Sequence, residues 1–304
     1  MPVLAAQPRP AQYGGHIAEE KPNDSRLRTH QALGLMRSTP IALLLALAGC
    51  GAQDEMPKVE TVTVVKSYPH DSQAFTEGLF LDGGTLFEST GEEGTSGIRK
   101  VNLDTGEVTA QAPLSAPYFG EGIIGWKDRI YQLTWKDQKG FIYNRADFKP
   151  LGEFAYKGEG WGLTHNGKSV IMSDGSATLR LLDPETMAQQ STLTVTANGC
   201  PVKDLNELEW IQGEIWANIW RTDLIARIDP ATGKVKSFVD VSALGPPTPS
   251  DDEVPNGIAY DSAAKRIFVT GKMWPQLYEV RVSDGAANGA AQDQAAALMR
   301  CQPS

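Results

Sequence analysis

The stretch Val101–Val108, VNLDTGEV, joins the end of an apolar strand to an aspartate, a Thr-Gly turn and the start of another strand. The same pattern recurs as LLDPET at Leu181–Thr186 and as IDPATGKV at Ile228–Val235. Weaker copies are IYNRA at Ile142–Ala146 and LYEVRV at Leu277–Val282. Because Asp-Pro and Thr-Gly pairs form tight turns between neighbouring strands, each copy predicts a hairpin.

These copies recur at a regular interval. Aligning them gives anchors with a mean spacing of 44.5 residues, at Asp104, Ala146, Asp183, Asp229 and Val282. An interval of about 40–50 residues is typical of four-stranded propeller blades. Five anchors therefore predict an all-β fold, a five-bladed β-propeller of four-stranded antiparallel blades over residues 59–284. A sandwich of short strands is the competing fold, but it does not explain the fixed interval.

The N-terminal region has a different character. Residues 41–48, IALLLALA, are an apolar run preceded by Met36 and Arg37. The run is shorter than the roughly 20 residues that span a bilayer, so it predicts an export signal. The sequence LAGC that ends at Cys50 resembles the lipobox of bacterial lipoproteins, in which the cysteine becomes the lipidated N-terminus. An ordinary signal peptide is the alternative.

We therefore divide the chain into five segments. Residues 1–35 are interpreted as an upstream extension, with translation starting at Met36, or as a disordered arm. The others are a signal peptide (36–50), a tether (51–58), the propeller (59–284) and a C-terminal tail (285–304). The tail is predicted to be frayed or weakly helical, without a buried face. The expected location is the periplasm. There the lipid on Cys50 is the only membrane attachment, and the absence of an aspartate after it favours the outer membrane.

The net charge of the chain limits the classes of binding partner. Without residues 1–50 the chain has 23 basic and 34 acidic residues, a net charge of −11. Such an acidic surface disfavours binding to nucleic acid and electrostatic docking on membranes.

Cys200 and Cys301 can pair in an oxidising compartment or remain as two thiols, and the sequence leaves both possibilities open. The protein is expected to act as a monomer.

Histidine is scarce in the same part of the chain. His70 and His165 are its only histidines, which excludes a zinc site built from three histidines. His165 precedes an Asn-Gly turn and is predicted to be half-exposed. His70 lies near a strand start and is predicted to be on the surface.

Six short motifs place carboxylate, amide, ammonium or indole groups beside glycines at the ends of predicted strands. They are FTEGL (Phe75–Leu79), FGEG (Phe119–Gly122), GWGLTHNG (Gly160–Gly167), LNELEW (Leu205–Trp210), ANIW (Ala217–Trp220) and GKMWP (Gly271–Pro275). A propeller gathers its strand ends around one axis, so these motifs are predicted to converge on a single site.

The ordered set of motifs resembles the glutaminyl cyclases of the plant and bacterial type, from about Val59 to Ser283. The resemblance implies a five-bladed propeller and an acyltransferase that converts the N-terminal glutamine of peptides and proteins to pyroglutamate with release of ammonia. It also implies that no metal or other cofactor takes part. One position departs from the family pattern, because Glu77 stands where the family often has glutamine.

The resemblance assigns roles to seven residues, and Glu77, where this chain departs from the family pattern, is placed with the substrate-binding residues. Glu121 matches the glutamate that shuttles protons, and Glu77 places a second carboxylate in the same cleft, which is expected to raise at least one pKa. The matches to the aromatic walls and to the groups that hold the substrate are Phe75, Phe119, Trp161, Trp220, Asn206 and Lys272.

Two other functions remain as alternatives. One is a binding propeller without catalysis. The other is a calcium-dependent lactonase-like propeller in which Glu77, Asn206 and Asn256 hold one ion. Residues near the motifs also have simpler interpretations: Trp210 and Trp216 as packing residues, and Glu207 and Glu209 as structural or solvated side chains.

Overall fold

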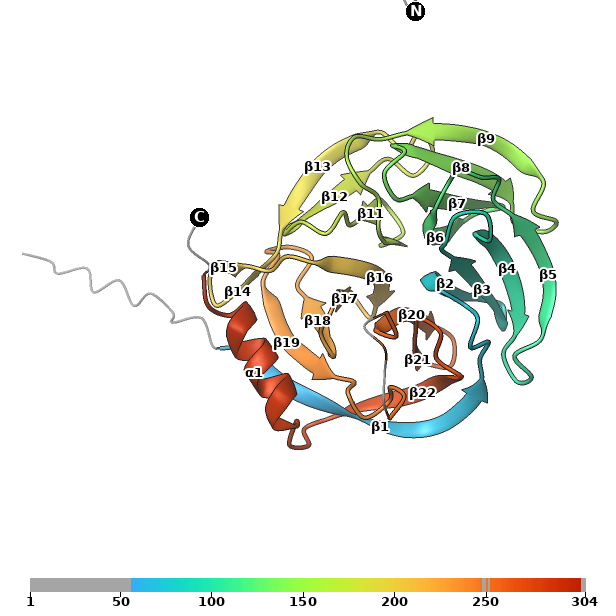
Figure 1. The fold of residues 1–304 in the computed structure, drawn as a ribbon. Helices are drawn as coiled ribbons and strands as arrows, with labels where there is room; N and C mark the ends of the chain where they lie inside the picture. Colours follow the sequence, from blue (N-terminus) through green and yellow to red (C-terminus); the bar gives the residue numbers. More distant parts are fainter. Residues whose placement is uncertain (1–55, 248–249, 251, 302–304) are drawn as a thin grey trace, which may run out of the picture. The chain divides into compact units, whose positions relative to one another are not determined.

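The computed structural model describes residues 56–247, 250 and 252–301. This part of the chain consists mainly of β-strands, with one helix near its C-terminal end (Figure 1). Its strands form three four-stranded sheets, one eight-stranded sheet and one two-stranded ribbon. The prediction of an all-β fold is therefore confirmed. The predicted extension, signal peptide and lipidated Cys50 lie outside the described residues.

Each four-stranded sheet is an antiparallel meander in which consecutive strands pair. The first contains β2 (Thr76–Asp82), β3 (Thr85–Thr90), β4 (Gly97–Asn102) and β5 (Val108–Pro113). The second contains β6 (Gly120–Trp126), β7 (Arg129–Thr134), β8 (Lys139–Asn144) and β9 (Pro150–Ala155). The third contains β10 (Leu163–His165), β11 (Val170–Met172), β12 (Thr178–Leu182) and β13 (Gln189–Thr194).

The eight-stranded sheet joins two further meanders through the first strand of the chain. One meander contains β16 (Leu205–Ile211), β17 (Glu214–Ile219), β18 (Leu224–Ile228) and β19 (Val235–Asp240). The other contains β20 (Pro255–Asp261), β21 (Arg266–Gly271) and β22 (Gln276–Ser283). Strand β1 (Lys58–Pro69) pairs antiparallel with β22 and, through Lys58–Thr61, parallel with β19. The two ends of the described β-structure are thereby tied together.

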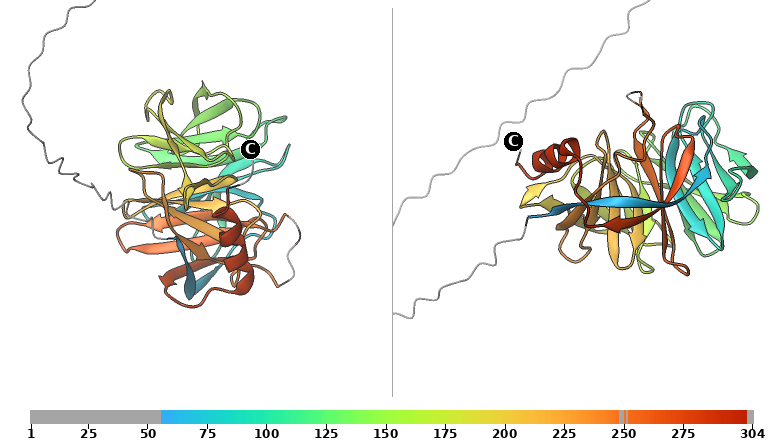
Figure 2. Two further views of the ribbon diagram at one scale, coloured as in Figure 1. Left: turned by 90° about the vertical axis from the view of Figure 1, so that its left-hand side faces the viewer. Right: turned by 90° about the horizontal axis from the view of Figure 1, so that it is seen from below.

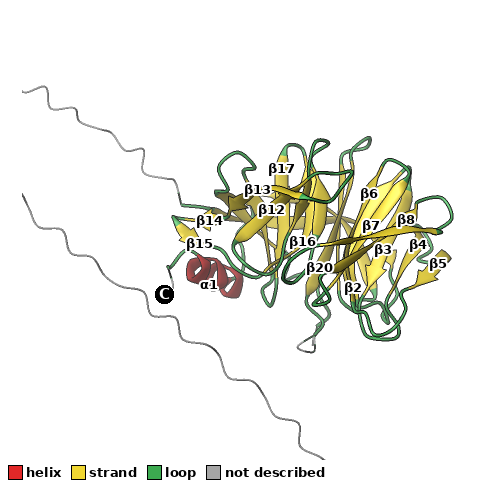
Figure 3. Cartoon of the chain, turned by 90° about the horizontal axis from the view of Figure 1, so that it is seen from above, coloured by secondary structure: helices red, strands yellow, loops and turns green. Residues whose placement is uncertain are grey.

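The sheets surround a common axis, and the first strand of each meander lies innermost (Figure 1). These inner strands contact one another in a closed order, β2 with β6, β6 with β10, β10 with β16, β16 with β20 and β20 with β2. Seen from the side, the strands run between two loop-bearing faces (Figures 2 and 3). The starts of all inner strands are therefore brought close to the axis.

The predicted hairpin turns lie between the third and fourth strands of four meanders. In each turn a side-chain oxygen accepts a hydrogen bond from the backbone N–H two residues later, as in the Asx turns of Asn102, Asn144, Asp183 and Asp229. The anchors Asp104 and Ala146 are wrong by two residues, because asparagine forms the same turn as aspartate. The anchor Val282 lies within β22, whose outer neighbour β1 comes from the other end of the chain.

The prediction that the C-terminal tail has no buried face is wrong. Residues Gly289–Leu298 form helix α1, which begins after the capping residue Asn288 and buries Ala291 and Ala295 against the core next to β18. Two alanines give a weak apolar pattern, but their small side chains let the helix approach the sheet closely. The tail is also tied by the disulfide Cys200–Cys301, one of the two states that the sequence left open. In the described part of the chain no helix has the length and apolar character needed to cross a membrane.

Candidate active site

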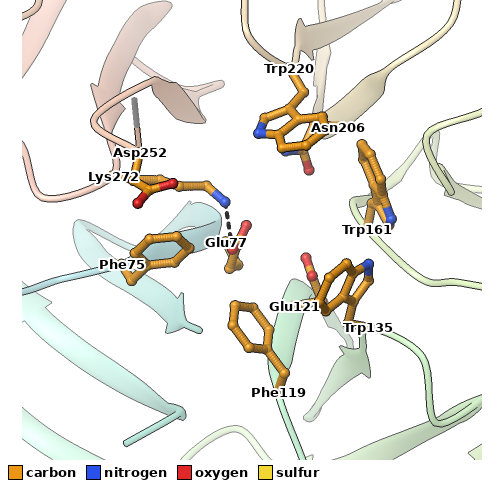
Figure 4. A pocket seen from close by; sticks show the side chains of 10 residues that line it. All are labelled: Phe75, Glu77, Phe119, Glu121, Trp135, Trp161, Asn206, Trp220, Asp252 and Lys272. Carbon is orange, nitrogen blue, oxygen red and sulfur yellow. Dashed lines mark hydrogen bonds and ion pairs between the residues drawn. The ribbon is translucent and has the colours of Figure 1, made fainter. Parts of the chain in front are cut away.

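A cavity of about 210 Å³ opens where the inner strands begin (Figure 4). All eight site residues predicted from the sequence lie in its wall. The lining residues are Phe75, Glu77, Phe119, Glu121, Trp135, Trp161, Asn206, Trp220, Asp252 and Lys272. Of these, Trp135 and Asp252 were not predicted from the sequence.

Four polar residues of this region occupy equivalent positions in their strands. Glu77, Glu121, Asn206 and Asn256 are each the second residue of an inner strand, β2, β6, β16 and β20 respectively. At each of these positions the pairing register with the next strand shifts. Such a bulge re-aims a side chain that regular pleating would direct to a sheet face. The bulges therefore explain why these four side chains point toward a common centre.

Buried serines hold the backbone beside two of these residues. Ser89 Oγ donates to the carbonyl oxygen of Glu121 over 2.6 Å, and Ser173 Oγ donates to that of Asn206 over the same distance. In both pairs the serine belongs to one meander and the carbonyl to the next. The positions of Glu121 and Asn206 are therefore fixed by hydrogen bonds between sheets.

Glu77 is part of a buried ion pair. Lys272 Nζ lies 2.6 Å from Glu77 Oε1, and Asn256 Nδ2 donates to Glu77 Oε2 over 3.1 Å. Burial raises the pKa of Glu77, and the Lys272 ammonium opposes that rise. The calcium alternative requires Glu77 and Asn256 to face one ion, but here an ammonium and an amide N–H group occupy the carboxylate.

Glu121 is buried and has no such partner. Its carboxyl group makes no hydrogen bond to any described residue, although 6% of the residue remains exposed. Burial raises the pKa of Glu121 well above the usual glutamate range, the charge of Glu77 raises it further, and Lys272 lowers it. Glu159 makes a smaller contribution that raises the pKa. The cavity thus holds one carboxyl group paired with an ammonium and one unpaired carboxyl group whose pKa is raised well above the usual glutamate range.

Aromatic rings form most of the cavity wall. Phe75 and Phe119 meet edge to face with ring centroids 6.1 Å apart, and Trp135 lies 5.7 Å from Phe119. Trp161 and Trp220 form a second edge-to-face pair at 5.6 Å. Rings in mutual edge contact resist reorientation, so the wall is suited to holding a bound chain in one conformation and excluding water.

Asn206 supplies an unused hydrogen-bonding group. Its side chain is buried, and its Oδ1 has no partner among the described residues. A buried amide without a partner is costly unless a bound molecule satisfies it. Figure 4 shows this amide between Trp220 and Trp161, facing the cavity.

Two predictions about histidine have different outcomes. His165 is half-buried at the end of β10, as predicted. The surface assignment of His70 is wrong: its Nε2 lies 2.9 Å from Glu88 Oε1, and its Nδ1 lies 2.6 Å from the carbonyl oxygen of Trp274. The carboxylate of Glu88 is a long-range partner that no neighbouring sequence reveals.

Other residues near the motifs are structural. Glu207 and Glu209 are buried and accept backbone N–H groups from neighbouring strands, including Ile258 N at 2.9 Å and Tyr260 N at 3.0 Å. Burial raises the pKa of Glu209 to about 8. Trp216 and Trp274 belong to one buried apolar cluster, and Trp210 packs against another.

One of the two missed cavity residues has a signal in the sequence. Trp135 follows the end of strand β7 directly, as Trp220 follows the end of β17. The repeated strand-then-tryptophan pattern could have identified Trp135. No comparable pattern surrounds Asp252. Among the described residues, no group of three or more His, Cys, Asp or Glu side chains is arranged to hold a metal ion.

Comparison with known proteins gives a consistent result. Residues 38–282 match the family model described as glutamine cyclotransferase. The chain is 41% identical over 236 residues to the glutaminyl-peptide cyclotransferase of Arabidopsis thaliana, covering 76% of this chain and 74% of that protein. The crystal structure of Myxococcus xanthus glutaminyl cyclase is similar with a TM-score of 0.71 and 35% identity, covering 76% of this chain and all of that one.

Proposed function

This chain belongs to the glutamine cyclotransferase family, and we propose that its cavity converts the N-terminal glutamine of peptides and proteins to pyroglutamate. The observation that carries the proposal is the pairing of two unlike carboxyl groups. Glu77 is held by Lys272, whereas Glu121 is buried, unpaired and directed into an aromatic cavity. This arrangement provides one group for proton transfer and another for binding.

In the proposed reaction the α-amine attacks the side-chain amide carbon of the same residue. A carbon–nitrogen bond forms, the bond to the amide nitrogen breaks, and the products are a five-membered lactam and ammonia. The amine loses one proton, and the leaving nitrogen gains one. Because both reacting groups belong to one residue, holding it in a cyclised conformation supplies much of the acceleration. The rings of Phe75, Phe119, Trp161 and Trp220 provide the enclosing surface.

We assign the proton transfer to Glu121. A carboxyl group with a raised pKa is a stronger base when ionised and still releases its proton to a departing amine. The same carboxyl can therefore take the proton from the attacking amine and return it to the leaving nitrogen. Its lack of a hydrogen-bond partner among the described residues leaves it available for both transfers.

We assign substrate orientation to Asn206 and Lys272. Negative charge develops on the amide oxygen of the substrate as the amine adds, and hydrogen-bond donors fixed beforehand stabilise it. The Lys272 ammonium has three donor hydrogens, of which the bond to Glu77 uses one. The side-chain amide of Asn206 is buried at the cavity and offers a donor as well as an acceptor.

We also propose that the sheets are the blades of a five-bladed propeller. Three separate meanders and the two within the eight-stranded sheet make five antiparallel units of four strands, if β1 is counted with β20–β22. The closed order of contacts among their inner strands supports this description.

The activity is tested by ammonia release from a dipeptide that begins with glutamine, in the presence and absence of EDTA. We expect turnover that resists the chelator and falls by about 10²–10⁴-fold in Glu121→Gln. Glu153→Gln is the matched control, because Glu153 is an exposed carboxylate of strand β9. Chelator-sensitive turnover of a lactone would support the calcium alternative, and absence of turnover on all such peptides would leave a binding protein.

For localisation we propose lipidation of Cys50 and retention at the periplasmic side of the outer membrane. The support is the motif LAGC after an apolar run. Labelled palmitate should be incorporated into the full chain expressed in a bacterial host and lost in Cys50→Ser. Incorporation that is unchanged in Cys50→Ser would contradict the assignment.

A further inference from the structure

Glu159 joins two tryptophans of the cavity wall. Its Oε2 accepts a hydrogen bond from Trp135 Nε1 over 2.8 Å and from Trp161 Nε1 over 2.9 Å. The tryptophans lie next to strands of different sheets: Trp135 comes after β7, and Trp161 precedes β10. Glu159 itself does not line the cavity. Figure 4 shows both indole nitrogens turned to the same side, away from the centre of the cavity.

The backbone beside Glu159 strengthens the link. Gly160 N donates to the carbonyl oxygen of Trp135 over 3.0 Å, and Gly122 N donates to the carbonyl oxygen of Trp161 over 2.7 Å. Both hydrogen bonds attach the segment that carries Glu159 and Trp161 to the meander β6–β9. The carboxylate of Glu159 therefore has a fixed place from which to orient the rings.

This carboxylate also closes a gap in the aromatic wall. On one side Phe119 contacts Trp135 at 5.7 Å, and on the other Trp161 contacts Trp220 at 5.6 Å. No direct ring contact joins these two pairs among the described residues. Hydrogen bonds to an ionised acceptor are stronger than neutral ones, so one carboxylate oxygen converts two separate pairs into a continuous surface.

We infer that Glu159 is a positioning residue for the cyclisation, which fixes the indoles of Trp135 and Trp161 as one rigid wall. The inference rests on the proposed function, because it names what the wall does in that reaction. Glu159 touches neither substrate nor reacting atoms in this role. Its carboxylate oxygen acts only by setting the orientation of the two rings.

Two variants separate geometry from charge. In Glu159→Ala both indole N–H groups lose their acceptor, and a misplaced wall is expected to lower kcat by about 10–100-fold while KM changes less. In Glu159→Gln the amide oxygen can still accept both hydrogen bonds. We therefore expect it to retain most of kcat. Because a negative charge near Glu121 is lost, the pKa of that carboxyl should fall and the corresponding limb of the pH profile should move to lower pH.

Glu185→Gln is the matched control. Glu185 Oε1 accepts from Trp126 Nε1 over 2.9 Å, a carboxylate–indole bond of the same kind outside this cavity. Its kcat and pH profile are expected to match those of the unchanged protein. Melting temperatures of all three variants establish that each is folded before kinetics are compared.

A readout without catalysis tests the contact itself. The chain has seven tryptophans, so ¹⁵N-labelled indoles give seven Nε1–H signals in a two-dimensional NMR spectrum. Two signals, from Trp135 and Trp161, should move and exchange faster with solvent in Glu159→Ala and stay close to their positions in Glu159→Gln. If both signals move but a folded Glu159→Ala keeps its kcat, the positioning role is wrong. If neither signal moves, the contact is wrong. Absence of turnover in the unchanged protein would instead refute the proposed function.

Discussion

Replacing Lys272 by methionine tests whether the ion pair with Lys272 is what distinguishes the carboxyl group of Glu77 from that of Glu121. The substitution removes the ammonium that lies 2.6 Å from Glu77 Oε1 and leaves only the amide of Asn256 as a partner. Glu77 is 2% exposed, so water can compensate only in part for the lost charge. Breaking a buried ion pair from one side costs about 3–5 kcal/mol. For a domain of this size that corresponds to a fall in Tm of about 6–20 °C.

The assay is urea unfolding at several pH values. A buried carboxylate without a counter-ion takes up a proton more readily, so the pKa of Glu77 should rise further in Lys272→Met. The folded state then binds a proton that the unfolded state releases. The loss in the free energy of unfolding, relative to the unchanged protein, should therefore be largest near neutral pH. It should shrink as the pH falls toward the ordinary pKa of glutamate. Adding Glu77→Gln to Lys272→Met removes the carboxylate that has lost its counter-ion. The double variant should therefore recover much of the lost stability.

An exposed pair provides the control. Lys149 Nζ lies 2.8 Å from Asp147 Oδ2 at the surface, and Lys149→Met should change stability far less than Lys272→Met, because water solvates both charges. Equal losses in Lys272→Met and Lys149→Met would refute the reasoning. So would additive losses in the Glu77→Gln/Lys272→Met double variant, because coupled partners should not add.

Three further changes have defined outcomes. Glu77→Gln removes a negative charge that raises the pKa of Glu121, so the matching limb of the kcat–pH profile should move to lower pH. Gly162→Ala puts a Cβ 2.2 Å from the carbonyl oxygen of Asn206 and should cost more than about 3 kcal/mol in urea unfolding, whereas Gly289→Ala, with nothing within 4 Å, should be neutral. Cys301→Ser should lower stability by about 2–5 kcal/mol, measured against the reduced parent, without changing kcat.

The sequence predicted the features that depend on local chemistry. Strand alternation and turn residues indicated the all-β fold, although Asn102 was overlooked as the start of a turn because the aspartate two positions later resembled the other copies. Features that depend on distant partners were not predictable. His70 is buried because Glu88 accepts its ring N–H, and Glu159 acts through two indoles that come from different sheets. Helix α1 depends on two alanines that give almost no apolar periodicity.

Close packing of the inner strands explains why polar residues next to glycine line the cavity. Inner strands of adjacent meanders approach so closely that a Cβ on Gly122 would lie 2.7 Å from Gly162 Cα, and one on Gly78 would lie 2.9 Å from Gly122 Cα. The third residue of an inner strand must therefore be glycine wherever the backbone of the next inner strand leaves no room for a Cβ atom. Glu207 is the exception, and its carboxylate occupies the axis by accepting the backbone N–H of Ile258. A carboxyl group one position earlier, such as Glu121, faces the cavity instead. The structural Glu207 and the proposed proton carrier Glu121 thus occupy positions that differ by a single step along an inner strand.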